Sequence, residues 1–180
     1  MKCLAEDTAV IAVDFQERMM PVIEDGETVA HNAEILLKGL GALGIPVIIT
    51  QQYTKGLGGT IASIADAAGT GTWFEKMTFS CCDDMEIFKK LKMLGRKNII
   101  VCGVESHICV LQTCIDLKSC GYQPYLVEDC IGSRKSNDKK NAVIRAVQEG
   151  VYITTYEAVL FELARRCKTD TFKIISNLIK

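Results

Sequence analysis

The sequence predicts an α/β fold: one parallel, doubly wound (Rossmann-like) sheet of about six strands with helices on both faces. Two observations predict it. Short apolar runs alternate with amphipathic stretches along the whole chain, and the length of 180 residues suits a single domain spanning residues 1–180. A strict alternation of strands and helices favours a parallel sheet whose crossover connections are right-handed.

Five apolar runs predict strands that are buried on both faces, because each is short, continuous and rich in β-branched residues. They cover residues 9–13, 47–50, 99–102, 125–127 and 151–154. A short sixth strand is expected near residues 73–76. These runs supply the whole predicted sheet.

Amphipathic stretches with helical spacing of apolar residues lie between or after these runs. They cover residues 29–43, 85–94, 109–120, 138–148, 157–165 and 171–179. Glycine, the usual residue at a left-handed helix end, directly follows three of them at Gly44, Gly95 and Gly121, and Gly150 follows a fourth after one intervening residue. The segment 51–80 is the exception, since it is long, rich in glycine and predicted to be largely irregular, as functional loops often are.

Composition excludes several classes of partner. The net charge is −1 with both signs interspersed, so nothing favours a nucleic acid partner. No apolar run approaches the roughly 20 residues that span a bilayer, so no membrane partner is expected. The nine cysteines lack zinc-finger spacing and follow no apolar leader, which indicates free thiols in a reducing cytoplasm.

Polar side chains follow several predicted strands, at the edge where open parallel sheets bind ligands. Asp14 follows the first strand, Lys76 the weak one near residues 73–76, and Cys109 opens the helix after residues 99–102. A helix start favours a thiolate and supplies N–H groups for an oxyanion, while Asp14 could take the thiol proton and Lys76 could stabilise negative charge. On position alone, each residue also has a structural reading that is commoner: Cys109 as a buried small residue, Asp14 as a helix cap or turn residue, and Lys76 as a solvated charge.

Three motifs resemble the isochorismatase-like cysteine hydrolases. Residues 12–16 (AVDFQ) resemble the D-x-Q opening of that superfamily, residues 76–80 (KMTFS) its lysine segment, and residues 102–110 (CGVESHICV) its nucleophile segment. The motifs occur in order, and the resemblance covers nearly the whole chain. A closer resemblance, to the isochorismatase domain-containing branch of unassigned substrate, rests on residues 52–58, 111–113, 133–134, 154–157 and 172–175.

This resemblance implies a catalytic triad of Asp14, Lys76 and Cys109. It also implies a cis peptide bond between Val104 and Glu105, which would direct the backbone N–H of Glu105 and that of Cys109 toward one oxyanion hole. Cys82 and Cys102 are the fallback candidates for the nucleophile. The pocket candidates, chosen for their positions near these motifs and in the segment 51–80, are Phe15, Gln16, Tyr53, Trp73, Phe79 and His107.

The chain departs from the nicotinamidase branch, which the resemblance associates with an aspartate and two histidines that bind a metal after the second strand. Here residues 51–55 read QQYTK, and the two histidines are His31 and His107, so no metal and no other cofactor are expected. Some members of the unassigned branch have been labelled ribonucleases, but nothing basic or aromatic in the sequence supports RNA as a substrate.

The predicted function is therefore a metal-independent cysteine hydrolase that acts on a small amide, imide or related carbonyl compound through a Cys109 thioester. The alternatives are hydrolysis of a non-amide small molecule, including the vinyl ether of isochorismate, and a non-catalytic oligomeric binding protein that retains the fold. A homo-oligomer is expected, because the last two predicted helices are unusually apolar and relatives of the resembling family commonly associate.

Overall fold

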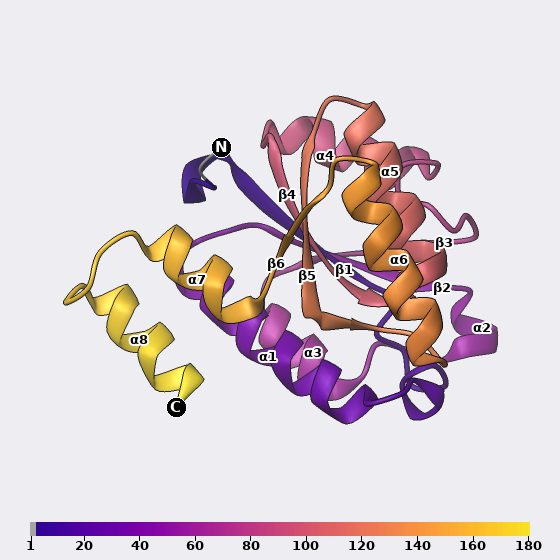
Figure 1. The fold of residues 1–180 in the computed structure, drawn as a ribbon, viewed down its shortest axis with the longest axis horizontal. Coiled ribbons are helices and arrows are strands. Elements are labelled where there is room, and N and C mark those ends of the chain that lie inside the picture. The colour runs from indigo at the N-terminus through magenta and orange to yellow at the C-terminus, as the bar shows by residue number, and fades with distance from the viewer. Residues whose placement is uncertain (1–2) are drawn as a thin grey trace.

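The computed structural model describes residues 3–180, and its centre is a six-stranded parallel sheet in the order β3-β2-β1-β4-β5-β6 (Figure 1). The strands are β1 (Thr8–Val13), β2 (Val47–Gln52), β3 (Thr72–Lys76), β4 (Asn98–Val104), β5 (Gln123–Gly132) and β6 (Tyr152–Thr154). The predicted doubly wound α/β sheet is thereby confirmed, including the weakly signalled β3. The chain crosses from β3 over to β4 on the other side of β1, which is the topological switch point where such sheets bind ligands.

The central strands pair in register and are fully buried. Val10 of β1 lies between Val47 of β2 and Ile100 of β4. Every residue of β1 and of β4 is buried, because helices cover both faces of the sheet. The apolar runs in the sequence are therefore continuous rather than alternating.

The two faces of the sheet have separate hydrophobic cores (Figure 1). On one face lie α1 (Gly26–Ala42), α3 (Ala62–Ala68), α7 (Tyr156–Ala164) and α8 (Asp170–Ile179). On the other lie α4 (Met85–Leu94), α5 (Leu111–Ser119) and α6 (Ser136–Gln148). Three short 3-10 or π-helical turns complete the chain: η1 (Ala5–Asp7), η2 (Met20–Val22) and η3 (Ser106–Val110). These turns include the segments that follow β1 and β4.

The segment 51–80 is more regular than its glycine content predicts. It contains the short helix α2 (Thr54–Leu57) and the helix α3, neither of which the sequence pattern indicated. Ile64 of α3 is fully buried in the first core. Because α3 has only seven residues, tertiary burial stabilises it rather than an intrinsic helical pattern.

The strand β5 is longer than predicted and continues through an irregularity in its pairing with β4. After the register shift, Ile131 and Gly132 pair with Gly103 and Val104. This second half of β5 brings the following residues, Ser133 and Arg134, against the segment after β4. Within the described part of the chain, no helix is long and apolar enough to cross a membrane.

Candidate active site

Three predicted residues from three different strand ends meet at one cavity or directly beside it. Asp14 follows β1, Lys76 is the last residue of β3, and Cys109 lies in η3 after β4. Asp14 and Cys109 line a cavity of about 180 Å³. Lys76 is not part of the lining, but its ammonium binds the Asp14 carboxylate. The carboxyl ends of parallel strands share one edge of the sheet, so residues distant in sequence come together there.

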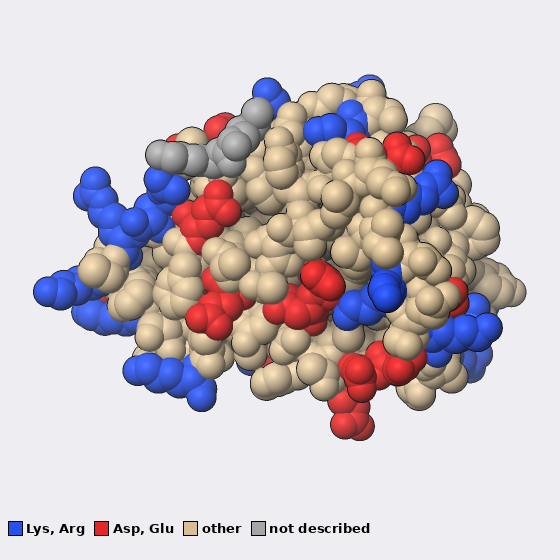
Figure 2. Space-filling model, in the orientation of Figure 1, with Lys and Arg blue, Asp and Glu red and all other residues tan. Residues whose placement is uncertain are grey.

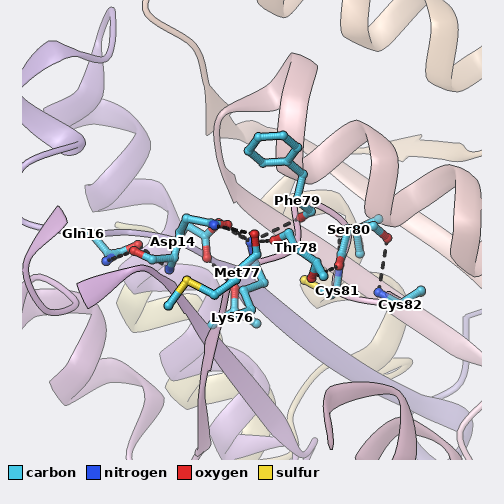
Figure 3. A network of polar contacts seen from close by, with 12 residues as sticks. Asp14, Gln16, Lys76, Met77, Thr78, Phe79, Ser80, Cys81 and Cys82 are labelled. Carbon is cyan, nitrogen blue, oxygen red and sulfur yellow. Dashed lines mark hydrogen bonds and ion pairs between the residues drawn. The ribbon is translucent and has the colours of Figure 1, made fainter. Parts of the chain in front are cut away.

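The Asp14 carboxylate is held through both oxygens. Lys76 Nζ donates to Asp14 Oδ2 at 2.7 Å, and Thr50 Oγ1 donates to Asp14 Oδ1 at 2.7 Å (Figure 3). The backbone of Asp14 has a φ of 53°, in the left-handed region that aspartate tolerates better than most residues. This conformation at the end of β1 is of the kind that functional sites retain despite its cost.

Lys76 is buried and surrounded by oxygen acceptors. Besides Asp14, its ammonium approaches Gln52 Oε1 at 2.7 Å and the carbonyl oxygens of Thr78 and Phe79 at 3.1 and 3.2 Å. Figure 3 shows the segment after Lys76 turning these two carbonyls toward the ammonium while the Phe79 ring points away. Four acceptors share three N–H groups, so every donor of Lys76 is occupied.

The charge of Lys76 is retained despite this burial. Desolvation alone would lower the pKa of the amine, but the negative charge of Asp14, together with the neighbouring Cys109 and Cys81, outweighs it and raises the pKa above its usual value. Lys76 therefore remains an ammonium at neutral pH. It is suited to stabilise charge, not to accept a proton.

Cys109 lies within the π-helical turn η3, directly before α5, and not in the first turn of a regular α-helix as predicted. The pKa of its thiol is raised to about 12, chiefly by burial; the charge of Asp14 also raises the pKa, while Lys76 lowers it. Burial and the adjacent carboxylate therefore outweigh the effect of the position near a helix start, which by itself favours a thiolate. The resting group is a thiol beside a carboxylate.

The turn between β4 and η3 depends on Gly103 and on a cis peptide bond. Gly103 has a φ of 128°, and a Cβ atom at this position would lie 2.0 Å from the carbonyl oxygen of Val13 on the adjacent β1. The cis bond between Val104 and Glu105 is present, which confirms that implication of the resemblance. Glu105 and Cys109, the two expected oxyanion-hole residues, both line the cavity.

The Glu105 carboxylate is tied down by Arg134, a contact that the sequence did not indicate. The Arg134 backbone N–H donates to Glu105 Oε2 at 3.0 Å, and its Nε approaches Oε1 and Oε2 at 3.2 and 3.1 Å. Glu105 is buried, whereas the Arg134 side chain is 58% exposed. The ion pair therefore holds Glu105, which lines the cavity, from the exposed side of the protein.

Gln52 is a site residue that sequence reasoning did not single out. Its side chain binds Lys76 and also donates to the Met77 carbonyl at 3.1 Å. Gln16, a pocket candidate, binds the backbone of Gln52 instead of lining the cavity: Gln16 Oε1 accepts from Gln52 N at 2.7 Å, and Nε2 donates to Gln52 O at 2.9 Å. The D-x-Q motif thus positions Gln52, which in turn holds Lys76.

Of the six pocket candidates, Phe79 alone lines this cavity. Phe15 is buried in the first core, Tyr53 and Trp73 are largely exposed, and His107 bonds to Ser133 Oγ at 3.0 Å. Four apolar lining residues, Met19, Leu57, Val104 and Ile108, carry no polar signal in the sequence. The complete lining is Asp14, Met19, Gln52, Leu57, Phe79, Val104, Glu105, Ile108 and Cys109.

The fallback nucleophiles lie outside the cavity. Cys102 is fully buried in β4 within the first core, and Cys82 is half-buried beside the second. Within residues 3–180, no group of three or more His, Cys, Asp or Glu side chains is arranged to hold a metal ion. Both histidines lie on separate elements, His31 in α1 and His107 in η3.

Comparison with known proteins shows that residues 8–158 match the model of the isochorismatase domain. The chain belongs to the isochorismatase family. Its curated relatives include the secreted isochorismatase effector Isc1 of Phytophthora sojae, which is 34% identical, with 99% of this chain and 87% of the relative covered. Isochorismatase domain-containing protein 2 of Danio rerio is 35% identical, with 96% of this chain and 86% of the relative covered.

Solved structures of the isochorismatase family share the fold. The MAR1 ribonuclease of Caenorhabditis elegans superposes with a TM-score of 0.94 at 31% identity, covering 99% of this chain and 92% of its own. The Escherichia coli YcaC product, described as an octameric hydrolase of unknown specificity, superposes with a TM-score of 0.93 at 21% identity over 99% and 89% of the two chains. A hydrolase role follows from the family, whereas its substrate does not.

Proposed function

We propose that this isochorismatase-family protein is a metal-independent cysteine hydrolase that cleaves a small amide, imide or related carbonyl compound through a thioester on Cys109. One observation carries the proposal: the Asp14 carboxylate is hydrogen-bonded to the buried Lys76 ammonium, and Asp14 and Cys109 line the same cavity. A nucleophile and a base at one cavity, with a fixed cation paired to the base, form the arrangement that acyl transfer requires.

The first half-reaction begins from the neutral thiol. Asp14 accepts the Cys109 proton as the sulfur attacks the substrate carbonyl carbon, which avoids a free thiolate in a buried site. The N–H groups of Glu105 and Cys109 would donate to the oxyanion, and the Lys76 ammonium offsets the negative charge nearby. Asp14 then returns the proton to the departing nitrogen, which leaves as ammonia or an amine.

The second half-reaction regenerates the enzyme. Water attacks the thioester carbonyl, and Asp14 accepts a proton from that water. Collapse of the tetrahedral intermediate breaks the C–S bond, releases the carboxylic acid and returns the proton to the Cys109 sulfur. Amide and water are consumed and carboxylic acid and amine are formed, so the cycle needs no redox partner.

The metal-independent part of the proposal is supported by the side chains at the end of β2. Gln51 and Gln52 stand there, and both amides already bind the protein: Gln51 Oε1 accepts from Thr60 N at 3.0 Å, and Gln52 binds Lys76. Activity should survive exhaustive treatment with a chelator. Loss of activity that is restored by zinc, iron or manganese would contradict this part alone.

A panel of small amides tests the proposal, with release of ammonia and carboxylate as the readout. Intact-protein mass spectrometry of quenched reactions should show an acyl adduct that maps to Cys109. The matched control is Cys102→Ala, which removes a buried thiol outside the cavity and should keep both signals. The thioester would be contradicted if the wild-type protein turned over substrate without an acyl adduct and Cys109→Ala kept that turnover.

The same panel separates the alternatives. Isochorismate is included with pyruvate release as its readout, which reports vinyl-ether cleavage. RNA is included because of the name of the Caenorhabditis elegans relative. On the face shown in Figure 2, charges of both signs are interspersed apart from Lys and Arg near α7 and α8, two helices that contribute nothing to the cavity lining. A protein inert toward the whole panel would favour the non-catalytic binding role.

We also propose a cytoplasmic location, supported by nine free cysteines, several of them buried. The Phytophthora sojae relative is named a secreted effector, so location requires its own test. Cell fractionation with antibody detection would give it. A protein found mainly outside the cell would contradict the cytoplasmic assignment.

A further inference from the structure

We propose that the cavity selects an uncharged, compact, apolar acyl group of about six to eight non-hydrogen atoms and rejects substrates that carry a carboxylate, isochorismate among them. This inference rests on the proposed function, because it assigns the substrate class of the same site. It depends on three properties of the cavity: its size, its apolar walls and the sign of the charges that face it.

The size of the cavity sets the length of the acyl group. Its volume is about 180 Å³, and a protein cavity of about 150 Å³ accommodates one benzene molecule. A single six-membered ring or a branched chain of similar bulk therefore fits above the Cys109 sulfur. A fused bicyclic group requires more room than the walls leave.

The upper walls of the cavity are apolar. Met19, Leu57 and Phe79 form the side contributed by the loops, while Val104 and Ile108 form the side contributed by the end of β4 and by η3. The loop walls are tied together, since Arg18 N donates to the Leu57 carbonyl at 3.0 Å. Each Å² of apolar ligand surface buried against them contributes about 25 cal/mol, so a hydrocarbon body is favoured.

The charged groups of the lining are both acidic. Asp14 and Glu105 face the cavity, and no Lys, Arg or His is among its lining residues. The two nearby cations are already paired within the protein. All three N–H groups of Lys76 are occupied, and the Arg134 guanidinium binds the Glu105 carboxylate. A carboxylate on the substrate would lose its hydration, would find no unpaired cationic side chain in the lining and would lie near the Asp14 carboxylate.

The same charges assist product release. Hydrolysis converts the neutral amide into a carboxylate, which lies beside Asp14 when it forms. Repulsion between like charges in a site of low dielectric weakens the binding of that product relative to the substrate. The cavity is therefore matched to a neutral substrate and an anionic product.

Binding to a Cys109→Ser variant tests the inference without requiring turnover. Isothermal titration calorimetry at pH 7 compares benzamide with benzoate, which have nearly the same shape but differ in charge. We expect benzamide to bind at least tenfold more tightly than benzoate, and also more tightly than acetamide or naphthalene-2-carboxamide. Benzoate binding as tightly as benzamide would overturn the inference, as would a benzamide that does not bind at millimolar concentration.

A charge-introducing variant provides the second arm. Leu57 is half-buried, so a lysine placed there can keep its ammonium hydrated at the rim of the cavity. In Leu57→Lys/Cys109→Ser, the affinity ratio of benzoate to benzamide should rise at least tenfold. Ile144→Lys on α6, outside the cavity, is the matched control and should leave the ratio unchanged. An unchanged ratio in the Leu57 variant would overturn the argument from charge.

The two proposals fail separately. If benzamide binds but no amide is hydrolysed by the wild-type protein, the proposed hydrolase activity fails and the selectivity of the cavity stands. If amides are hydrolysed but carboxylate-bearing acyl groups are preferred, the selectivity fails and the hydrolase activity stands.

Discussion

Lys76 and Asp14 form an ion pair of 2.7 Å between Nζ and Oδ2, with side-chain exposures of 0% and 3%. The pair joins the end of β3 to the end of β1 across the intervening strand β2. Water is almost excluded from it, so each charge depends on the other for its stability. This dependence makes the pair central both to the chemistry of the site and to the stability of the fold.

Lys76→Met should destabilise the protein by about 3–5 kcal/mol, because it leaves the Asp14 carboxylate buried without its cation. Turnover should be lost as well. Urea unfolding measures the first effect. The double variant Asp14→Asn/Lys76→Met should be less destabilised than the sum of the two single variants, since no uncompensated charge remains. Simple additivity of the three free energies of unfolding would contradict the coupling.

Asp14→Asn should abolish turnover and yet accelerate alkylation of Cys109 by iodoacetamide. The carboxylate raises the pKa of the thiol through its charge and through a hydrogen bond, so its removal lowers that pKa. Each unit of decrease raises the thiolate fraction at neutral pH about tenfold. Peptide mass spectrometry over a time course gives the alkylation rate.

Asp66→Asn in α3 is the control for this experiment, since Asp66 is exposed and remote from the cavity lining. It should leave both turnover and alkylation unchanged. Slower alkylation of Cys109 in the Asp14 variant would show that the carboxylate does not hold the thiol proton.

Cys109→Ala should remove turnover and adduct formation while the fold remains intact, as judged by circular dichroism and thermal unfolding. The residue lines the cavity and packs against the second core, where the small apolar side chain of alanine can take its place. Cys82→Ala and Cys102→Ala are the controls. If Cys109→Ala kept wild-type turnover and either control lost it, the nucleophile would have to be reassigned.

Stability should fall above about pH 9. Burial raises the pKa of the Cys102 thiol from 9.0 to about 12, and a group whose folded pKa is raised contributes stability below its unfolded pKa that is lost as pH rises toward the folded one. In that window each such thiol costs about 1.4 kcal/mol per pH unit. Guanidinium unfolding at pH 8, 9 and 10 measures the slope.

Replacement of Cys102 by alanine should flatten this slope by about one proton, because alanine does not ionise on unfolding. Val101→Ala, a buried neighbour in β4, is the matched control. It should lower stability at every pH and leave the slope as in the wild type. An identical slope in Cys102→Ala would refute the assignment of this titration.

The protein is expected to be a homo-oligomer of at least two copies. In the structure, Val159, Leu160 and Ile175 cover the sheet, but Phe161 and Ile174 remain 37% and 49% exposed at the same end of the molecule. A stable interface would bury on the order of 2,000 Å² in total. Light scattering behind size exclusion should give at least twice the monomer mass. A monomer mass across micromolar concentrations would contradict the expectation.

The sequence alone determined much of the fold. The continuous apolar runs predicted five of the strands. Helices cover both faces of this sheet, so its strands are apolar throughout, and short β-branched runs of that kind are typical of such strands. Glycines predicted helix ends because the left-handed conformation is local; Gly95, for example, has a φ of 62°. Position at the strand ends made Asp14, Lys76 and Cys109 candidates, whereas the resemblance of their motifs to a known family implied the triad.

The tertiary structure alone decided the cavity walls and the state of its groups. Met19, Leu57 and Ile108 have no polar pattern that marks them, and they meet because loops far apart in sequence are tied together. The helix α3 is stabilised by burial of Ile64, and that contact does not appear in any local window of sequence.

The charge state of the site also lay beyond the sequence. Position near a helix start favoured a thiolate at Cys109, but its pKa depends on burial and on a carboxylate 95 positions earlier in the chain. The same holds for Lys76, whose four acceptors come from the ends of β1 and β2 and from the turn after β3. Local sequence predicts where the backbone turns, whereas electrostatic energies depend on which side chains the completed fold brings within a few ångströms of one another.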